Sequence, residues 1–509
     1  MTATKDAFWI TRNPVGFARD VLRARRRTDA PRPPGPRGRP FIGVLPEFQA
    51  DPYGYLQHLG NVYGDVYRLP LPSYDVVILN HPDHVRHLMN HRDGEYSMIG
   101  PVSWVRYVLG TSMMMLEGEK FRQRRKLLTP MMGRRQLAKI AAIVADEFAN
   151  RLAKWDRFAD TGDQIDLQHE LVGLVMPAFM RATFSLAPPE AELHQLDVDV
   201  RLLFHSVAAP FFLGPPPRLL PGAENPVQVW RRMRRWVTRH VEQRLADSQS
   251  YDDMMQVVLD ARYQDGTPIS RRDAITEIIM LIGGGYEMTV AALSWTLGFL
   301  TQNPQAQQRL YDEIDALDGA VPTFDDLDRL RWAKACFDEG QRLQDHPLMP
   351  RFAMIDDSIG GYRIRRGNLI GISPYALHRD PRWWGPDPNT YDPMRFYDKD
   401  IVTARPNLAF IPFGAGPHRC FGASLGYLGA QFLLAQIHQR FRIQTPPGWA
   451  PQHGPDRPWP WQPFSRLPNG GSPGLRISTG MVVRSRPSSE GIFGLHTPIR
   501  RPAHPRIQA

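Results

Sequence analysis

The chain has 509 residues, 42% of them hydrophobic, and a formal net charge of +10. This length is enough for a large buried core, and two cysteines cannot form a disulfide scaffold. The basic residues are not interleaved with a nucleic-acid motif, so nucleic-acid binding is not expected.

No uninterrupted apolar run approaches about 18 residues, so no membrane-spanning anchor is expected. The N-terminal segment has no apolar stretch of signal-peptide length and is expected to be a terminal arm over residues 1–30. A weak basic amphipathic helix on a membrane surface is the alternative for this arm. Proline-rich APRPPGPRGRP (30–40) then separates the arm from the body. We expect a cytoplasmic protein.

Strand and helix patterns follow one another in the first half of the body. A strand pair is predicted at 65–70 and 74–79. Apolar residues recur every third or fourth position at 134–155 and 227–248, which predicts two amphipathic helices. Prolines and glycines predict a loop at 210–226.

The second half is dominated by a helix predicted at 270–302. It begins with a serine cap and is apolar nearly all round, so we expect it to run through the middle of a large domain. Further helices are predicted at 331–344 and 423–440, short strands at 350–373, and an irregular segment at 380–412. A long irregular segment inside a compact domain usually has a functional reason.

The stretch FGAGPHRCFG (413–422) places Cys420 just before a predicted helix start. Helix N-termini and nearby cations lower the pKa of a thiol, so we expect a stabilised thiolate. Its glycines let the backbone turn tightly and approach something large and flat. The thiolate could be a nucleophile, a redox thiol or a metal ligand.

Each alternative makes a different demand on the loop. A nucleophile needs a base, and His418 is close in sequence but need not face the sulfur. A zinc site needs three or four ligands, and neither a second cysteine nor an HxxxH pattern lies near. One thiolate is enough where a porphyrin supplies the other four iron ligands.

The loop resembles the haem-binding loop of the cytochromes P-450, whose pattern is Phe-x-x-Gly-x-(Arg or His)-x-Cys-x-Gly. The resemblance implies haem b as cofactor and Cys420 as the axial ligand of its iron. The expected cofactor-binding residues of the loop are Phe413, Gly414, His418, Cys420 and Gly422, and Gly416 completes the pattern.

Two further motifs fit the same family in order and spacing. EGQR supplies Glu339 and Arg342, which three-residue spacing places on one face of a helix. In the family this pair joins an arginine upstream of the cysteine in a buried lock. YDPMRF supplies that arginine, Arg395, with Pro393 and Phe396, and has Met394 where glutamate is commoner.

The haem propionates are carboxylates that need cationic or N–H donors. Positions that match the family's donors are Arg125, Arg351 and His418. The sequence departs from the family at Phe121, where tryptophan or histidine usually donates to a propionate. This departure puts the propionate geometry in question.

Proton delivery in the family depends on the pattern (Ala/Gly)-Gly-x-(Asp/Glu)-Thr in the long central helix. The matching stretch here is GGYEM (284–288), so Glu287 is the expected catalytic acid and Met288 replaces the threonine. Successive glycines suggest a helix opened beside a flat ligand. Either Thr289 replaces the missing hydroxyl through a one-residue shift, or protons pass through Glu287, water or a substrate hydroxyl.

The resemblance implies a mainly α fold, with a large helical domain around the haem and a small β-rich lobe. The expected units are the arm (1–30), the haem domain (31–486) and a polar tail (487–509). The expected function is a monooxygenase, monomeric, that inserts one oxygen atom from O₂ into a hydrophobic small molecule such as a terpenoid, sterol, fatty acid or polyketide-like compound. Because Met288 replaces threonine, a peroxide-dependent or non-oxygenating enzyme is the alternative, and a non-catalytic haem sensor is a third.

No flavin or iron–sulfur domain is recognisable in the chain, so electrons are expected from an external ferredoxin or flavodoxin-type donor with its reductase. A basic surface would steer an acidic donor, although a solvated charged face is an equal alternative. The residues proposed for this surface are Arg122, Arg124, Lys126, Arg134 and Arg135. The substrate pocket is expected to draw on residues 92–116, 202–214, 346–354 and the central helix.

Overall fold

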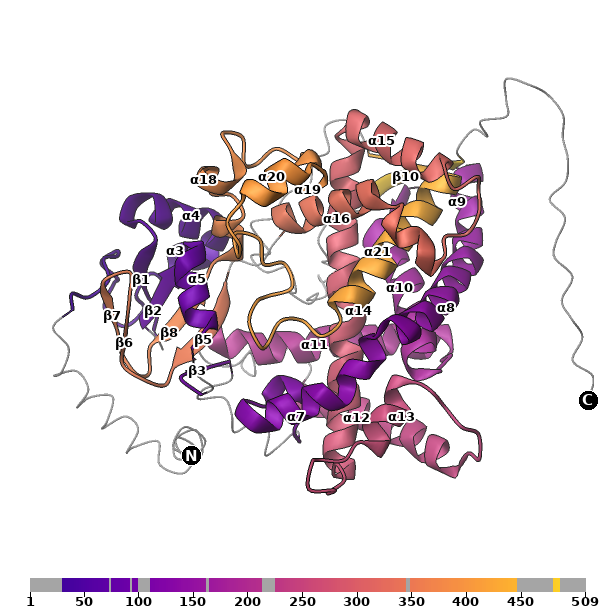
Figure 1. The fold of residues 1–509 in the computed structure, drawn as a ribbon, viewed down its shortest axis with the longest axis horizontal. Coiled ribbons are helices and arrows are strands. Elements are labelled where there is room, and N and C mark those ends of the chain that lie inside the picture. Colours follow the sequence, from indigo (N-terminus) through magenta and orange to yellow (C-terminus); the bar gives the residue numbers. More distant parts are fainter. Residues whose placement is uncertain are drawn as a thin grey trace, which may run out of the picture.

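The structure is a computed structural model that describes residues 30–72, 75–91, 94–98, 110–161, 164–212, 225–344, 348–445 and 479–485. The expected N-terminal arm, apart from Ala30, and the expected C-terminal tail lie outside the described residues. Most of the described chain is helical, with a small sheet lobe at one end of the molecule (Figure 1).

The sheet lobe is built on a five-stranded sheet with the strand order β1-β2-β8-β5-β3. β2 and β8 are parallel, and the other neighbouring pairs are antiparallel. Strand β2 is buried on both faces: Val76 and Ile78 pack with residues of α3 and α4, and Val77 and Leu79 pack with residues of α5. The strand pair predicted from the sequence is confirmed as β1 and β2.

Two smaller sheets complete the β structure. One has the order β4-β10-β9, and the other is the hairpin of β6 and β7. The strands are β1 (Val66–Pro70), β2 (Asp75–Leu79), β3 (Tyr96–Ser97), β4 (Gln164–Asp166), β5 (Met349–Ala353), β6 (Asp357–Ile359), β7 (Tyr362–Ile364), β8 (Leu369–Ile372), β9 (Phe441–Gln444) and β10 (Thr479–Ser485).

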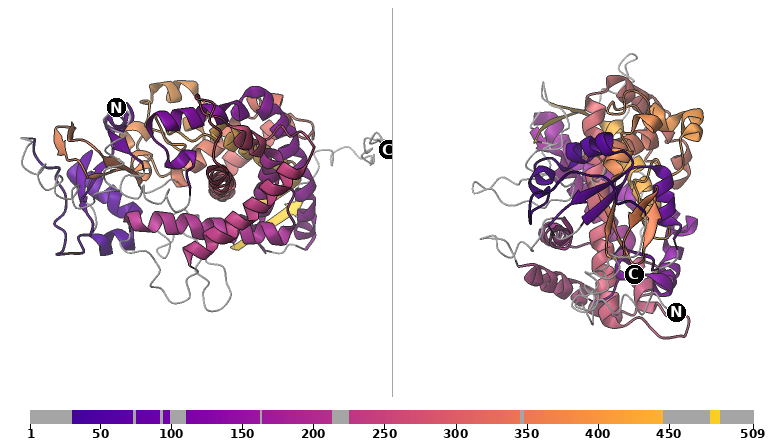
Figure 2. Two further views of the ribbon diagram at one scale, coloured as in Figure 1. Left: turned by 90° about the horizontal axis from the view of Figure 1, so that it is seen from below. Right: turned by 90° about the vertical axis from the view of Figure 1, so that its left-hand side faces the viewer.

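The helical body surrounds α14 (Arg271–Thr301), which contacts α10, α12, α13, α15, α16 and α21. The Ser270 hydroxyl accepts a hydrogen bond from the Asp273 N–H at 3.1 Å and caps the first turn. Seen from below, the sheet lobe lies at one end of the molecule, and seen from the left-hand side it lies in front of the helical body (Figure 2). The predicted central helix and its serine cap are therefore confirmed.

The helices predicted at 134–155, 227–248, 331–344 and 423–440 are confirmed as α8, α12, α16 and α21. The segment expected to be irregular, 380–412, contains the short helices α18, α19 and α20. The predicted loop at 210–226 is wrong for its first three residues, because α11 continues to Phe212, and for Pro226, which begins α12. Residues 213–224 lie outside the described chain. The helices are α3 (Leu45–Ala50), α4 (Pro52–Tyr63), α5 (Pro82–Met89), α7 (Gly118–Leu128), α8 (Arg134–Leu152), α9 (Asp156–Thr161), α10 (Leu167–Phe184), α11 (Glu190–Phe212), α12 (Pro226–Ala246), α13 (Met254–Asp260), α15 (Pro304–Asp315), α16 (Arg331–Gln344), α17 (Pro374–Leu377), α18 (Pro381–Trp384), α19 (Met394–Tyr397), α20 (Lys399–Ala404) and α21 (Ala423–Arg440).

Among the described residues, α14 alone is long and apolar enough to cross a membrane. Its apolar character is spread along the helix, so a search for uninterrupted apolar runs does not find it. Of its most apolar 18-residue window, 67% is buried inside the protein. This burial is typical of a central core helix.

Candidate haem site

The Cys420 loop leads into α21 and is held by its own backbone. The Cys420 N–H donates to the Phe413 carbonyl at 2.8 Å. Gly414 and Gly416 both have φ of 70°, a conformation that glycine adopts without strain. A Cβ on Gly416 would also lie 3.2 Å from the Met89 side chain, so this glycine lets the loop pack against the end of α5.

Gly422 is different, because none of the described residues requires a glycine there. Its φ is −85°, which any residue adopts, and a Cβ added to it would have no atom within 4 Å. Gly422 lies two residues after Cys420 and is the N-cap residue of α21. A flat group lying close to the backbone beside the thiol would explain the glycine, so this position fits a haem.

The environment of Cys420 corrects one expectation. Although the residue is exposed, desolvation by the surrounding protein raises the pKa of its thiol. A hydrogen bond from the Gly422 N–H and the charges of Arg125 and Arg419 lower the pKa without outweighing desolvation. The thiolate is therefore not favoured by the protein alone. A coordinated metal ion deprotonates a thiol outright, so the same groups would support an iron-bound sulfur.

Arg351 is a buried cation near this loop. Arg351 lies in β5, and its Nη1 atom donates to the Pro350 carbonyl at 2.8 Å. No carboxylate of the described residues lies within ion-pair distance, and burial lowers the pKa of Arg351 to about 10, with Glu117 acting in the opposite direction. A buried guanidinium of this kind is suited to an anionic ligand.

Arg125 and His418 complete a cluster with Arg351. Arg125 Nη1 donates to the Arg419 carbonyl at 2.8 Å, and the His418 ring stacks on Phe121 with 3.9 Å between the ring centroids. Burial, followed by the charges of Arg351 and Arg125, lowers the pKa of His418 to about 4. The imidazole is therefore neutral at pH 7. The structure brings together the three expected propionate donors, and Phe121 contributes ring stacking in place of a hydrogen bond.

The buried lock expected from two motifs is confirmed. Arg342 makes two hydrogen bonds to Glu339, Nε to Oε2 and Nη2 to Oε1, each 2.7 Å long. Both side chains are completely buried. Arg395 Nε lies 3.6 Å from the Glu339 carboxylate. Arg342 also donates to the carbonyls of His378 and Pro388, so the lock fixes the segment that leads to Cys420.

The glycines of α14 have separate explanations. Residues 271–301 form one continuous α-helix, so the expected opening of the helix is not observed. A Cβ on Gly285 would lie 2.0 Å from the Phe179 ring, which shows that this glycine allows α10 to pack closely. Gly284 is exposed, and a Cβ there would have no atom within 4 Å. Gly284 thus resembles Gly422 in having no packing reason among the residues that the structure describes.

Glu287 lies in a charged environment between α14 and α11. Burial raises its pKa to about 7, with Arg201 acting to lower it and Asp197 to raise it. Arg201 Nε donates to Asp197 at 3.0 Å, and the Tyr286 hydroxyl donates to the same carboxylate at 2.8 Å. A carboxyl group with this pKa both gains and loses a proton near neutral pH. Sequence reasoning missed these α11 partners, since no local pattern connects them with Glu287.

Thr289 lies on a different side of the site. A Cβ on Gly426 of α21 would be 3.8 Å from the Thr289 hydroxyl and 3.5 Å from the Phe413 ring. The hydroxyl is therefore directed towards α21 and the Cys420 loop. Because α14 has no opening, the structure contains no register shift that would carry Thr289 into the place of Met288.

The basic surface proposed from sequence needs one correction. Arg124 is completely buried and forms a 2.7 Å ion pair with Glu277, so it is a core residue. Arg122 and Arg134 are exposed and pair with Glu119 and Asp325. The remaining exposed cations of this group are Lys126 and Arg135.

Part of the expected substrate-pocket segments lies outside the described residues. The pocket residues outside the described chain are 92–93, 99–109, 213–214 and 346–347.

A sequence model described as cytochrome P450 matches residues 33–466. The Mycobacterium tuberculosis protein named cytochrome P450 132 is 28% identical over 77% of this chain and 87% of its own. Cyclooctat-9-en-7-ol 5-monooxygenase of Streptomyces melanosporofaciens is 27% identical over 80% and 89%. Among solved structures, retinoic-acid-bound cyanobacterial CYP120A1 superposes with a TM-score of 0.74 and 21% identity, covering 90% of this chain and all of that chain.

The chain belongs to the cytochrome P450 family. It is a haem-thiolate monooxygenase with a haem iron cofactor, a hydrophobic substrate and an external source of electrons. The mainly α fold with a small β lobe, expected from the sequence, is confirmed by the structural neighbour.

Proposed function

We propose that Cys420 ligates a haem b iron, and that Arg125, Arg351 and His418 hold the propionates. The observation that carries this assignment is the group of two guanidinium cations and a neutral imidazole beside the cysteine loop, with Arg351 buried. When bound, the haem supplies oxygen activation, which a thiolate ligand favours. Phe413, Gly414 and Gly422 shape the loop around it.

Two residues of α14, Glu287 and Thr289, are candidates for proton delivery, and Glu287 is the stronger. Glu287 is the catalytic acid because burial places its pKa at about 7, near the working pH. Thr289 is the weaker candidate because its hydroxyl lies towards α21. Met288 has no proton to donate, so a hydroxyl on the substrate is expected to assist.

The proposed substrate is therefore a bulky apolar molecule that carries its own polar group. Terpenoids, sterols, fatty acids and polyketide-like compounds all meet this description. One relative is named as a monooxygenase of cyclooctat-9-en-7-ol, and this name supports a substrate that carries a hydroxyl group. Methionine-rich stretches such as 113–115 suit an adaptable apolar pocket.

The proposed electron donor is an acidic ferredoxin or flavodoxin that docks on the thiolate side. Exposed Lys126 and Arg135, together with Arg419 beside Cys420, supply the positive charge. Complementary charge raises the association rate, and this advantage falls with ionic strength. The enzyme is proposed to act as a cytoplasmic monomer.

A spectrum of the reduced, carbon-monoxide-bound protein tests the ligand assignment. The wild type should show a thiolate-type Soret band, and Cys420→Ser should lose it while Cys336→Ser, at the other cysteine, keeps it. A thiolate-type band in Cys420→Ser would refute the assignment. Cys336 is buried with a pKa raised far above the ordinary thiol value by desolvation, so it is a matched control.

A peroxide-dependent reaction is the second candidate function, and Met288 is the observation that favours it. Product formation from hydrogen peroxide without any electron donor would support it. Met288→Thr should then improve the coupling of electrons to product only if donor-driven oxygenation is the native reaction. A non-catalytic haem sensor would instead show no turnover with either oxidant.

A further inference from the structure

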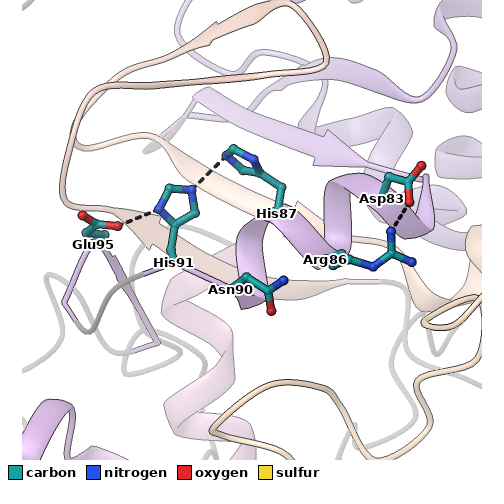
Figure 3. Close-up of a pocket in the computed structure, with 6 residues that line it drawn as sticks. All are labelled: Asp83, Arg86, His87, Asn90, His91 and Glu95. Carbon is teal, nitrogen blue, oxygen red and sulfur yellow. Dashed lines mark hydrogen bonds and ion pairs between the residues drawn. The ribbon is translucent and has the colours of Figure 1, made fainter.

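A cluster of two histidines and a carboxylate lies outside the haem site, at the end of α5. His87 Nε2 lies 2.8 Å from Asp357 Oδ2 and 2.9 Å from His91 Nε2. His91 Nε2 lies 3.1 Å from the same Asp357 oxygen. Figure 3 shows the two rings directed towards each other, with Glu95 on the far side of His91. The three ligand atoms thus form a small triangle.

The fold holds this triangle through neighbouring polar groups. His91 Nδ1 lies 2.6 Å from Glu95 Oε2, and the Tyr96 hydroxyl donates to Asp357 Oδ2 at 2.7 Å. With Nδ1–H donating to Glu95, a neutral His91 presents the Nε2 lone pair to the triangle. A carboxylate on the second nitrogen orients metal-binding histidines in the same way.

The triangle contains more acceptors than one proton can satisfy. In that tautomer, the His91 Nε2 lone pair faces the Asp357 oxygen, and His87 supplies a single N–H between them. With the His87 hydrogen on Nδ1 instead, His87 Nε2 also presents a lone pair, and one cation would then satisfy all three. Atoms this close together share a point above their plane about 2.0–2.2 Å from each, which is the range of zinc–ligand distances.

We propose that His87, His91 and Asp357 bind a divalent transition-metal ion of the zinc type. Two imidazoles favour zinc, copper or nickel over magnesium and calcium, which prefer oxygen ligands. Three protein ligands leave a fourth position for water. The cluster borders a surface hollow of about 560 Å³, and His87 is exposed, so an ion can enter from solvent.

The ion would tie together chain segments that are distant in sequence. His87 belongs to α5, His91 follows that helix, and Asp357 begins β6. Met89, between the histidines, contacts Gly416 of the cysteine loop. The metal is therefore expected to stabilise the edge of the sheet lobe that supports the haem loop, without taking part in the oxygen chemistry.

Zinc binding to the full-length haem protein, prepared without a histidine tag, tests the proposal. After equilibrium dialysis, elemental analysis counts zinc separately from haem iron. The wild type should retain about one zinc, and its melting temperature should rise with zinc. His91→Ala and Asp357→Asn should each weaken zinc binding at least 10-fold and lose this rise. His58→Ala, which removes an exposed histidine of α4, should change neither quantity.

Equal zinc binding by the wild type, His91→Ala and Asp357→Asn would overturn the proposal, as would a wild type that retains no zinc. The carbon-monoxide spectrum shows whether each variant keeps its folded haem site. If Asp357→Asn fails to fold, His87→Gln replaces it, because His87 is exposed and its loss removes one ligand. Zinc X-ray absorption should show two imidazoles in the wild type, and a spectrum without imidazole would also refute the site.

Discussion

Arg342 and Arg351 are both buried arginines near the cysteine loop, but their partners differ. Arg342 has a carboxylate, Glu339, and several backbone carbonyls within hydrogen-bond distance. Arg351 has one backbone carbonyl and no carboxylate of the described residues within ion-pair distance. The protein therefore satisfies the first cation itself and leaves the second available to an anion from outside.

This difference separates a structural charge from a binding charge. Removing one partner of a fully satisfied buried pair leaves an uncompensated charge in the core. Removing an unpaired buried cation relieves a desolvation cost instead. Substitution of Arg342 should consequently lower the free energy of unfolding, whereas substitution of Arg351 should weaken haem binding, and the following measurements test that contrast.

The largest effect is expected for Arg342→Ala. It should lower the free energy of unfolding by about 3–5 kcal/mol, because Glu339 becomes a buried, unpaired carboxylate. Chemical denaturation of the purified haem protein measures this free energy. A variant that yields no folded protein would show the same destabilisation in its extreme form. Arg122→Ala removes an exposed pair with the same spacing and should cost about 1 kcal/mol or less. Similar losses for both variants would contradict the structural role of the lock.

The Glu119–Arg122 and Glu339–Arg342 pairs also show what can be predicted from the sequence alone. EKFR (119–122) and EGQR (339–342) contain the same Glu-x-x-Arg spacing, yet only the second is buried. The family resemblance selected the second because of its place relative to Cys420. Spacing alone could not, since burial depends on which distant segments pack over the pair.

The second effect is a loss of haem affinity in Arg351→Met. The variant should release haem about 10²-fold more readily, which corresponds to about 2.7 kcal/mol, because a buried charge-assisted bond to a propionate is lost. Transfer of haem to an acceptor protein measures the release. Lys126→Met, an exposed change on α7, should leave release unchanged. Unchanged release in Arg351→Met would break the contrast between the two arginines.

The third prediction concerns Glu287, a half-buried acid whose pKa desolvation raises to about 7. Between its ordinary pKa and 7, the folded protein holds a proton that the unfolded chain has released, so this group lowers stability as pH rises. Glu287→Gln should remove that loss and make the protein more stable than the wild type by about 1–3 kcal/mol at pH 8, with little difference at pH 4.5. Denaturation at the two pH values measures it. A constant difference across the range would show that Glu287 is not protonated by the fold.

The parts of the candidate site that lie in short sequence motifs can be predicted from the sequence. The parts that depend on how distant segments pack together cannot. Cys420 and its glycines were found from ten consecutive residues. Arg124 was placed on a basic surface because its neighbours are basic, whereas the fold buries it against Glu277 from α14. The cluster of His87, His91 and Asp357 had only the His-x-x-x-His spacing as a local signal, and its carboxylate lies far along the chain.

The smallest expected effect distinguishes a glycine that faces a ligand from one that faces solvent. Gly284 in α14 and Gly173 in α10 are both exposed helical glycines, and a Cβ on either has no atom within 4 Å. Alanine is favoured over glycine in helices by about 1 kcal/mol, so Gly173→Ala should stabilise the haem protein by up to that amount. Gly284→Ala should lose this gain and shift the Soret band, because its methyl group would meet the haem or a molecule bound beside it. Equal stabilisation by both changes, with an unaltered spectrum, would place Gly284 away from the cofactor and leave Gly422 as the glycine that marks the haem position.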